Sequence, residues 1–277
     1  MISPTTDTVP AHALSVPGAR LHYELRGAGP LVALVGSPMD AASFAPLATL
    51  LATGHTVLTT DPRGINRSPV TDPDSESTPE LRADDLSLLL AHLDAGPAAV
   101  LGSSGGAATV LALAQAHPEQ VHTVIAHEPP LAQLLPDRQA LLSATDDMIA
   151  TYLRGDIIAA WRKFMRTANI ELPAGMLEMM FGPDRDARQL ADERRWFARE
   201  LRATNGWQPD LAALRTASPR IIVGIGTDSA GQLCDRASRA LAAELGVEPT
   251  MFSGGHTAFT ENPERFAAEL RAVLGDD

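Results

Sequence analysis

The chain has 277 residues, of which 45% are hydrophobic and 20% are charged, and its formal net charge is -12. This composition is typical of a globular protein, and no apolar run approaches the roughly 20 residues that a membrane-spanning helix needs. The 22 basic residues are dispersed among 34 acidic ones, which argues against a nucleic-acid partner because phosphate binding needs clustered Lys and Arg. We therefore expect a small-molecule substrate as the partner, and neither nucleic acid nor membrane.

The N-terminal stretch MISPTTDTVP has neither a basic start nor an apolar segment, so no secretory signal is visible and a cytoplasmic protein is expected. The single cysteine, Cys234, excludes an intramolecular disulfide and lies in a helical pattern as a small packed residue. The spacing of the histidines indicates no metal site. We expect no cofactor and no metal, and the sequence leaves open whether the chain forms a homodimer.

The first strands differ in their hydrophobic patterns. Residues 19–27 alternate apolar and polar side chains, as a half-exposed edge strand does, whereas residues 31–35 are apolar throughout. The second run therefore predicts a parallel strand at the centre of the sheet, covered on both faces. Asp40 is placed to cap a helix over residues 41–52, and residues 56–60 form the next strand.

The middle of the chain contains the best-defined unit. Pro79 suits the first turn of a leucine-rich helix that ends near Gly96. After it, the strand 98–101, the helix 105–116 and the strand 121–126 form one βαβ unit. This alternation of strands and helices predicts an α/β fold with a parallel sheet.

The pattern becomes helical between residue 129 and residue 209, which predicts an inserted helical cap on a core formed by 1–128 and 210–277. Alternation resumes with the strand 220–226 and with a helix that stops at Gly246. A last strand over 249–253 and a terminal helix complete the chain. The predicted organisation is therefore one α/β core interrupted by one helical insertion.

A glycine-bracketed serine pair links the strand and the helix of the βαβ unit. The segment Gly102-Ser103-Ser104-Gly105-Gly106 has the pattern G-x-S-x-G, in which small neighbours allow a serine to stand at a strained strand-to-helix turn. This frame selects Ser104 as the candidate nucleophile. A serine hydroxyl needs a base, and His256, in a Gly-Gly-His loop after the last strand, is the candidate.

The order Ser, acid, His, with the serine in such a turn, resembles the α/β-hydrolase superfamily from about residue 19 to the end of the chain. The closest resemblance within it is to cofactor-free haloperoxidase-like and esterase-like members. It implies an α/β-hydrolase fold, with a mostly parallel eight-stranded sheet flanked by helices, a nucleophile elbow at Ser104 and an inserted cap.

The oxyanion site follows from the same resemblance. Gly105, directly after the nucleophile, offers one backbone N–H. The segment Gly36-Ser37-Pro38 resembles the His-Gly-x-Pro segment of those members, which makes Ser37 the second donor because Pro38 has no N–H. Val35 and Gly36 stand where His-Gly is usual, so the loop lacks the support of that histidine.

The acid that orients His256 has two candidates. Asp228 follows the strand 220–226, although the resemblance places the carboxylate one residue further on, at Ser229. Glu128 follows the strand after the nucleophile helix, a position that some haloalkane dehalogenase-like members use. The sequence favours neither Asp228 nor Glu128 as the acid.

Aromatic and methionine side chains in the cap indicate an apolar or aromatic substrate. The residues expected to contact it are Met39, Trp161, Met179, Met180, Phe181 and Trp196. We predict a serine hydrolase of the carboxylesterase type that acts on an ester, lactone or thioester. The alternatives are a biosynthetic cyclase, carbon–carbon bond hydrolase or perhydrolase on the same fold, and a ligand-binding protein without turnover.

Overall fold

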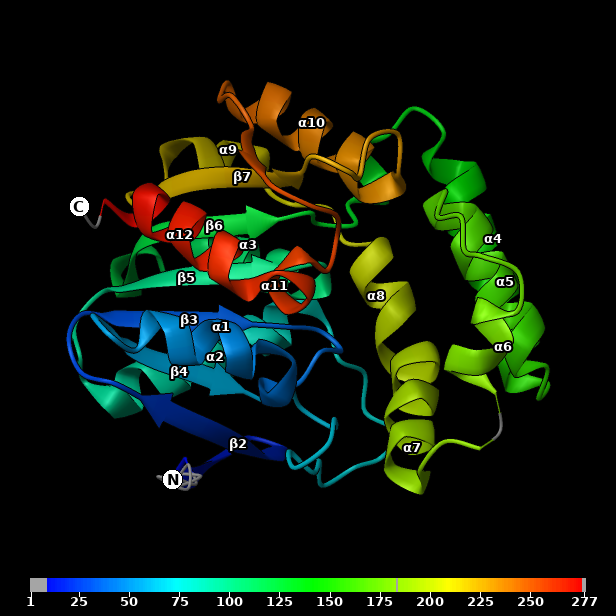
Figure 1. Cartoon of the computed structure of the whole chain (residues 1–277), viewed down its shortest axis with the longest axis horizontal. Coiled ribbons are helices and arrows are strands. Elements are labelled where there is room, and N and C mark those ends of the chain that lie inside the picture. Colours follow the sequence, from blue (N-terminus) through cyan, green and yellow to red (C-terminus); the bar gives the residue numbers. More distant parts are fainter. Residues whose placement is uncertain (1–8, 183, 276–277) are drawn as a thin grey trace, which may run out of the picture.

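The computed structural model of the chain describes residues 9–182 and 184–275, and its centre is an eight-stranded sheet (Figure 1). The strand order is β1-β2-β4-β3-β5-β6-β7-β8, in which β1, β2 and β4 pair antiparallel and all other neighbours pair parallel. The strands are β1 (Ala11–Val16), β2 (Ala19–Arg26), β3 (Leu31–Val35), β4 (Thr56–Thr60), β5 (Ala98–Ser103), β6 (Val121–His127), β7 (Arg220–Gly226) and β8 (Thr250–Phe252).

Helices cover both faces of the sheet, so the predicted α/β-hydrolase fold is confirmed. In Figure 1, α1, α11 and α12 lie in front of the sheet, while α2 and α3 lie on the other face. The core helices are α1 (Ala41–Leu51), α2 (Pro79–Leu93), α3 (Gly105–Ala116), α9 (Leu211–Thr216), α10 (Leu233–Leu245), α11 (Ala258–Glu261) and α12 (Pro263–Leu274), with short η1 (Pro118–Gln120) and η2 (Ala132–Leu134) turns.

The central strand β3 explains why two helical layers are needed. Leu31 and Ala33 pack into the core on one face of the sheet, and Val32 and Leu34 pack into the core on the other. Successive side chains of a strand point to opposite faces, so an all-apolar strand is stable only when both faces are covered. The predicted central position of residues 31–35 is therefore confirmed.

The expectation that residues 19–27 form the edge strand is wrong. β1 pairs with residues 19–24 of β2 and is itself the edge, and a turn at Gly18 with a φ of 76° joins the two strands. β1 is largely exposed, so it has no continuous apolar side that its sequence would show. Several predicted helix boundaries are confirmed, since the Ser43 N–H donates to the Asp40 carboxylate and Gly246 ends α10 with a φ of 69°.

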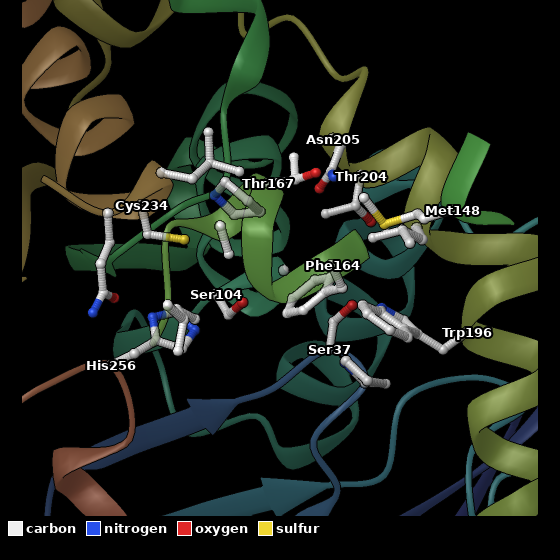
Figure 2. A pocket seen from close by; sticks show the side chains of 18 residues that line it. Ser37, Ser104, Met148, Phe164, Thr167, Trp196, Thr204, Asn205, Cys234 and His256 are labelled. Atoms are coloured by element: carbon white, nitrogen blue, oxygen red, sulfur yellow. The ribbon is translucent and has the colours of Figure 1, made fainter. Parts of the chain in front are cut away.

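The segment between β6 and β7 is helical, as predicted, and we call residues 138–205 the helical insertion. It contains α4 (Arg138–Leu153), α5 (Ile157–Ala168), α6 (Met176–Phe181), α7 (Ala187–Arg195), η3 (Trp196–Glu200) and α8 (Leu201–Asn205). It lies beyond the carboxyl ends of the strands in Figure 1, and a cavity lies between it and the sheet edge (Figure 2). The division into a cap domain (129–209) and a core stays a prediction.

In the part of the chain that the structure describes, no helix combines the length and the apolar character that crossing a membrane requires. The expectation of a cytoplasmic location rests on the N-terminal segment. Most of that segment, residues 1–8, lies outside the described residues.

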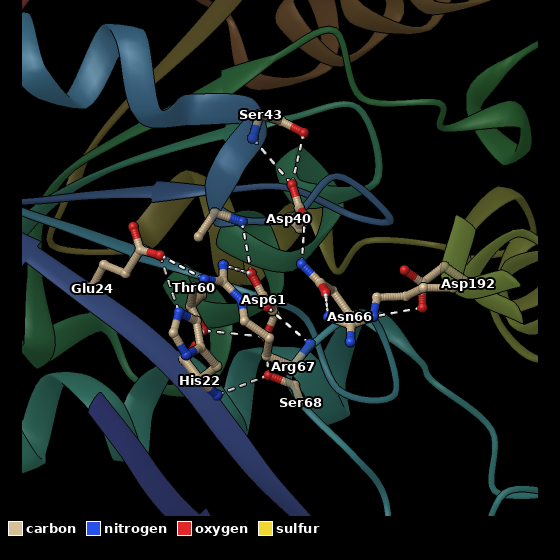
Figure 3. Close-up of polar contacts among 12 residues, drawn as sticks. His22, Glu24, Asp40, Ser43, Thr60, Asp61, Asn66, Arg67, Ser68 and Asp192 are labelled. Carbon is tan, nitrogen blue, oxygen red and sulfur yellow. Dashed lines mark hydrogen bonds and ion pairs between the residues drawn. The ribbon is translucent and has the colours of Figure 1, made fainter. Parts of the chain in front are cut away.

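Buried charges hold the loop after β4 (Figure 3). Asp61 is fully buried; its Oδ1 accepts from the N–H of Ala41 at 2.9 Å and its Oδ2 accepts from Nε of Arg67 at 2.8 Å. The neighbouring Arg63 binds Asp85 of α2 with both Nε and Nη2, at 2.7 and 2.6 Å. These contacts join the loop to α1 and α2 and give this Asp-Pro-Arg-Gly segment (61–64) a structural role.

The same loop reaches the helical insertion. The Asn66 N–H donates to Asp192 at 2.9 Å and its side-chain amide donates to Asp40 at 2.8 Å. Arg188 of α7 in turn donates to the Asn66 side-chain oxygen at 2.9 Å. The loop therefore connects the start of α1 to the insertion.

Replacing Asp61 by alanine should lower the free energy of unfolding by about 3 kcal/mol, because it removes the acceptor of a buried ion pair and of the first N–H of α1. Urea unfolding followed by circular dichroism measures this loss. The matched control is Asp84→Ala, whose exposed carboxylate pairs with His117 and should matter by less than about 0.5 kcal/mol. Equal losses in the two variants would contradict the structural role of Asp61.

Candidate active site

The carboxyl edge of the sheet brings together residues that are far apart in the sequence. Ser104 follows β5, Glu128 follows β6, Gly226 ends β7, and His256 follows β8. These four strands are consecutive neighbours in the sheet. Because neighbouring parallel strands end at the same edge, the side chains after them can meet there.

Ser104 stands in a strained turn, with φ 57° and ψ -123°. Such a conformation costs on the order of 1–3 kcal/mol for a residue with a Cβ and persists only where its surroundings enforce it. A Cβ on Gly102 would lie 2.2 Å from the Gly106 carbonyl oxygen, and one on Gly106 would lie 2.1 Å from that of Val35. Glycine is therefore required on both sides of the serine for β3, β5 and α3 to pack this closely.

Glu128 binds the histidine. Its Oε2 lies 2.5 Å from Nδ1 of His256, and its Oε1 accepts from the N–H of Gly226 at 2.8 Å. Glu128 is fully buried and, like Ser104, has a positive φ, 53°. Burial by itself raises the pKa of this carboxyl, but the hydrogen bond and charge of His256 outweigh that effect and lower the pKa to about 2. An ionised carboxylate only accepts hydrogen bonds, so Nδ1 of His256 carries a proton and Nε2 is left to act as a base.

The other candidate acid lies elsewhere. Asp228 is exposed, and the contact of its carboxylate is with the Thr227 hydroxyl at 3.3 Å, so the structure does not bring it to His256. Ser229, where the resemblance places the acid, is fully buried. Its hydroxyl has no hydrogen-bond partner among the described residues. A small hydroxyl therefore stands where the resemblance places the acid, and the carboxylate that contacts His256 comes from the end of β6 instead.

The two expected oxyanion donors lie on segments in direct contact. A Cβ on Gly105 would lie 2.7 Å from both the carbonyl oxygen and Oγ of Ser37, so the loop after β3 packs against the start of α3. Ser37 and Gly105 both line the cavity that Ser104 and His256 line. The Ser37 hydroxyl donates to the buried carboxylate of Glu200 in the helical insertion. The two residues expected to supply oxyanion donors therefore lie next to each other at the cavity that Ser104 lines.

The cavity that Ser104 and His256 line is largely apolar. Aromatic and aliphatic side chains of the insertion form part of its wall, and polar Thr167, Thr204 and Asn205 lie together at one end of it (Figure 2). Its lining residues are Ser37, Pro38, Ser104, Gly105, Pro130, Met148, Phe164, Thr167, Ala168, Ile170, Trp196, Leu201, Thr204, Asn205, Gln232, Leu233, Cys234 and His256. An apolar pocket with few polar groups is typical of small-molecule sites.

Only some of the residues that were expected to contact the substrate line this cavity. Trp196 lines it, whereas Met39 and Trp161 line a second, more open hollow beside α7 that Trp196 also borders. Phe181 stacks on Trp161 with 3.8 Å between ring centroids. These aromatic residues therefore hold the insertion together or face its outer hollow.

The structure does not bring Met179 and Met180 to the cavity. Both lie on α6 and are exposed, Met179 to 72% and Met180 to 46%. The short helix α6 lies at the outer side of the insertion, where Phe181 makes the aromatic contact. A methionine-rich sequence does not tell which face of such a helix turns inward.

Sequence reasoning missed Glu200, although a signal was present. Phe197, Glu200, Leu201 and Thr204 recur at the spacing of one helix face, and a carboxylate on an apolar face is unusual. The structure buries all four. Among the described residues, no group of three or more His, Cys, Asp and Glu side chains is placed to hold a metal ion.

A second histidine lies beneath the site. His127 is fully buried, with Nδ1 3.1 Å from the Ser103 hydroxyl and its ring in edge contacts with Phe252 and Phe266. Burial lowers the pKa of His127 from 6.5 to about 4, although the charge of Glu128 opposes the shift. His127 is therefore neutral near neutral pH and packs as part of the core.

The fold, the strained serine turn and the Glu128–His256 contact together define a member of a known class. The chain belongs to the alpha/beta hydrolase family, whose sequence profile matches residues 31–269. It is 32% identical over 280 residues to the uncharacterized hydrolase YraK of Bacillus subtilis (strain 168), and the match covers 96% of this chain and 97% of that protein. These relationships support an enzyme of the hydrolase type.

Solved structures show the same fold. A thermophilic esterase from Thermogutta terrifontis has a TM-score of 0.73 at 20% identity, with 96% of this chain and 98% of the other covered. The enol-lactonase from Burkholderia xenovorans LB400 has a TM-score of 0.68 at 19% identity, with 95% and 100% covered. At these identities the two structures establish the shared fold alone.

The low pKa of His127 should make stability depend on pH. The unfolded state binds a proton below pH 6.5 and the folded state only below about pH 4, so stability falls as the pH falls through this range. Between about pH 7 and about pH 5 the loss from this group should be about 2 kcal/mol, and His127→Gln should remove it. Urea unfolding at both pH values measures the difference. His12→Gln, at an exposed position, should behave as wild type, and an equal pH effect in both variants would contradict the prediction.

Proposed function

We propose that the protein is a serine hydrolase that cleaves an ester, lactone or thioester through Ser104, His256 and Glu128. The observation that carries the proposal is the buried, ionised Glu128 on Nδ1 of His256, a histidine that lines the same cavity as Ser104. A serine gives acyl transfer rather than the alkyl-ester chemistry of an aspartate nucleophile. The residues form the nucleophile, base and orienting acid of such a reaction.

The proposed reaction depends on the hydrogen bond that orients His256. Nε2 of His256 takes the proton of Ser104 as Oγ attacks the carbonyl carbon, and Glu128 stabilises the imidazolium that forms. The N–H groups of Ser37 and Gly105 receive the negative charge on the carbonyl oxygen. His256 then returns the proton to the leaving oxygen or sulfur. Water, activated by the same imidazole, releases the acyl group from Ser104.

The cavity favours a small apolar or aromatic substrate. Phe164, Trp196, Met148 and Leu201 form an apolar wall around the reacting serine. Burying an apolar group against such a wall contributes about 25 cal/mol for each Å2 removed from water. The esterase and the enol-lactonase that share the fold support an ester or lactone as the substrate class.

The two candidate acids make the first test. Glu128→Gln should lower kcat/KM for p-nitrophenyl butyrate by about 10³- to 10⁴-fold, because an amide neither stabilises the imidazolium nor holds the required tautomer. Asp228→Asn removes the same charge from an exposed position and should leave kcat/KM within about twofold. Intact-mass measurement of fluorophosphonate labelling on Ser104 provides a second readout for both variants.

Two outcomes would refute this assignment. Full ester turnover by Ser104→Ala would exclude the serine mechanism, and a larger loss in Asp228→Asn than in Glu128→Gln would exclude Glu128 as the acid. Labelling of Ser104 without turnover of any simple ester would favour the specialised chemistries, namely a cyclase, carbon–carbon bond hydrolase or perhydrolase. Tight ligand binding without product would favour a binding protein.

The cavity wall makes a second test. Phe164→Ala should raise KM for p-nitrophenyl butyrate by about tenfold, because it removes a large apolar contact with the bound acyl group. Met179→Ala deletes an exposed side chain outside the cavity and should leave KM unchanged. Steady-state kinetics of both variants measure the effect. A rise in KM for Met179→Ala alone would place the substrate at α6 instead.

A further inference from the structure

A buried carboxylate of the helical insertion contacts the loop that carries an oxyanion donor. Glu200 is fully buried, and its Oε1 accepts from the hydroxyl of Ser37. Glu200 ends η3, a π-helical turn in which the Leu201 N–H donates to the Trp196 carbonyl. Such turns insert an extra residue into a helix and are frequent at functional sites. Here the turn joins α7 to α8 at the point where the insertion meets the loop after β3.

Glu200 also faces a buried cation. Nη1 of Arg82 in α2 lies 4.0 Å from Oε1 of Glu200. Burial lowers the pKa of Arg82, and the charge of Glu200 is the largest effect that opposes this shift. Arg82 donates in addition to Thr109 of α3 at 3.0 Å and to Thr204 of α8 at 3.1 Å. The guanidinium therefore ties two core helices to the insertion beside Glu200.

This arrangement is costly for the folded state. Oε2 of Glu200 is buried and has no hydrogen-bond partner among the described residues. A half-satisfied buried carboxylate is less stable than an apolar side chain of similar size would be. Packing alone therefore does not explain the charge at position 200, and its contact with Ser37 suggests a role in the reaction.

We propose that Glu200 is a positioning residue for the oxyanion site, an inference that rests on the proposed function. By holding the Ser37 hydroxyl, Glu200 fixes the Ser37 backbone, so that its N–H points to the volume it shares with the N–H of Gly105. A Cβ on Gly105 would lie 2.7 Å from Oγ of Ser37, so this loop packs closely against the start of α3. The contact also makes the oxyanion site depend on the docked position of the insertion.

The kinetic consequence is specific. Oxyanion donors bind the charge that develops in the transition state, so their misplacement lowers kcat and leaves the binding of a neutral ground state little changed. Loss of a packing contact in the cavity wall would instead raise KM. The ratio of the two effects therefore separates a positioning role from a structural one.

The experiment compares Glu200→Ala, Glu200→Gln, Ser37→Ala and the double variant Ser37→Ala/Glu200→Ala on p-nitrophenyl butyrate. All rates are normalised to the number of sites that a fluorophosphonate labels at completion. Glu200→Ala and Ser37→Ala should each lower kcat about tenfold with KM within about twofold, since both remove the same hydrogen bond. Glu200→Gln should retain most of kcat, because its amide oxygen still accepts from Ser37.

The double variant decides whether the two residues act together. Its kcat should match that of the more affected single variant, about a tenfold loss rather than the hundredfold loss of independent effects. The matched control is Glu24→Ala, which removes another buried carboxylate, paired with Arg26 and Arg67 on the opposite side of β4 from β3. It should lower stability and leave kcat per labelled site unchanged.

The possible failures are distinguishable. Unchanged kcat in Ser37→Ala and Glu200→Ala, independent losses in the double variant, or an effect on KM alone would each overturn the positioning role. If Glu200→Ala does not fold, Ser37→Ala still tests the contact, because it keeps the backbone N–H and loses only the hydroxyl. A wild-type protein that neither turns over esters nor labels at Ser104 would refute the proposed function itself.

Discussion

The candidate site depends on the hydrogen bond between Glu128 and His256. Glu128 carries a buried negative charge, and groups at this edge of the sheet stabilise it. The carboxylate has no solvent to stabilise it, so it needs the imidazole on one oxygen and the Gly226 N–H on the other. These contacts connect the ends of β6 and β7 with the loop after β8. The geometry of the proposed site and the connection between three neighbouring strand ends therefore depend on the same charge.

The position of this acid illustrates how one fold accommodates alternative arrangements. The side chains after neighbouring parallel strands point toward a shared volume, so a carboxylate after β6 can replace one after β7. A glutamate has one more methylene than an aspartate, which extends its reach across a strand. At the position where the resemblance places the acid, the buried Ser229 has only a short side chain without a carboxylate. The exposed Asp228 then has no constraint that turns it toward His256.

Polar contacts attach the helical insertion to the sheet edge, and Leu141 of α4 also packs in an apolar cluster beside the sheet. Asn66 binds Asp192 and Arg188 at one end of α7, while Ser37 and Arg82 contact Glu200 and Thr204 where η3 joins α8. Its own apolar cluster, which includes Tyr152, Trp196 and Phe197, is separate from the two clusters that flank the sheet. The cavity therefore lies between the edge of the sheet and an insertion that has an apolar cluster of its own.

The sequence by itself determined the features that depend on neighbouring residues: the central strand 31–35, the Asp40 cap, the glycine frame of Ser104 and the loop that carries His256. These follow from backbone sterics and from side-chain periodicity, which act over a few residues. Only the tertiary structure decided that β1 covers β2, that Glu128 and not Asp228 reaches His256, that Met179 and Met180 face away from the cavity, and that Glu200 meets Ser37. Each of these depends on distances between segments remote in sequence, and a one-dimensional pattern carries no information about those distances.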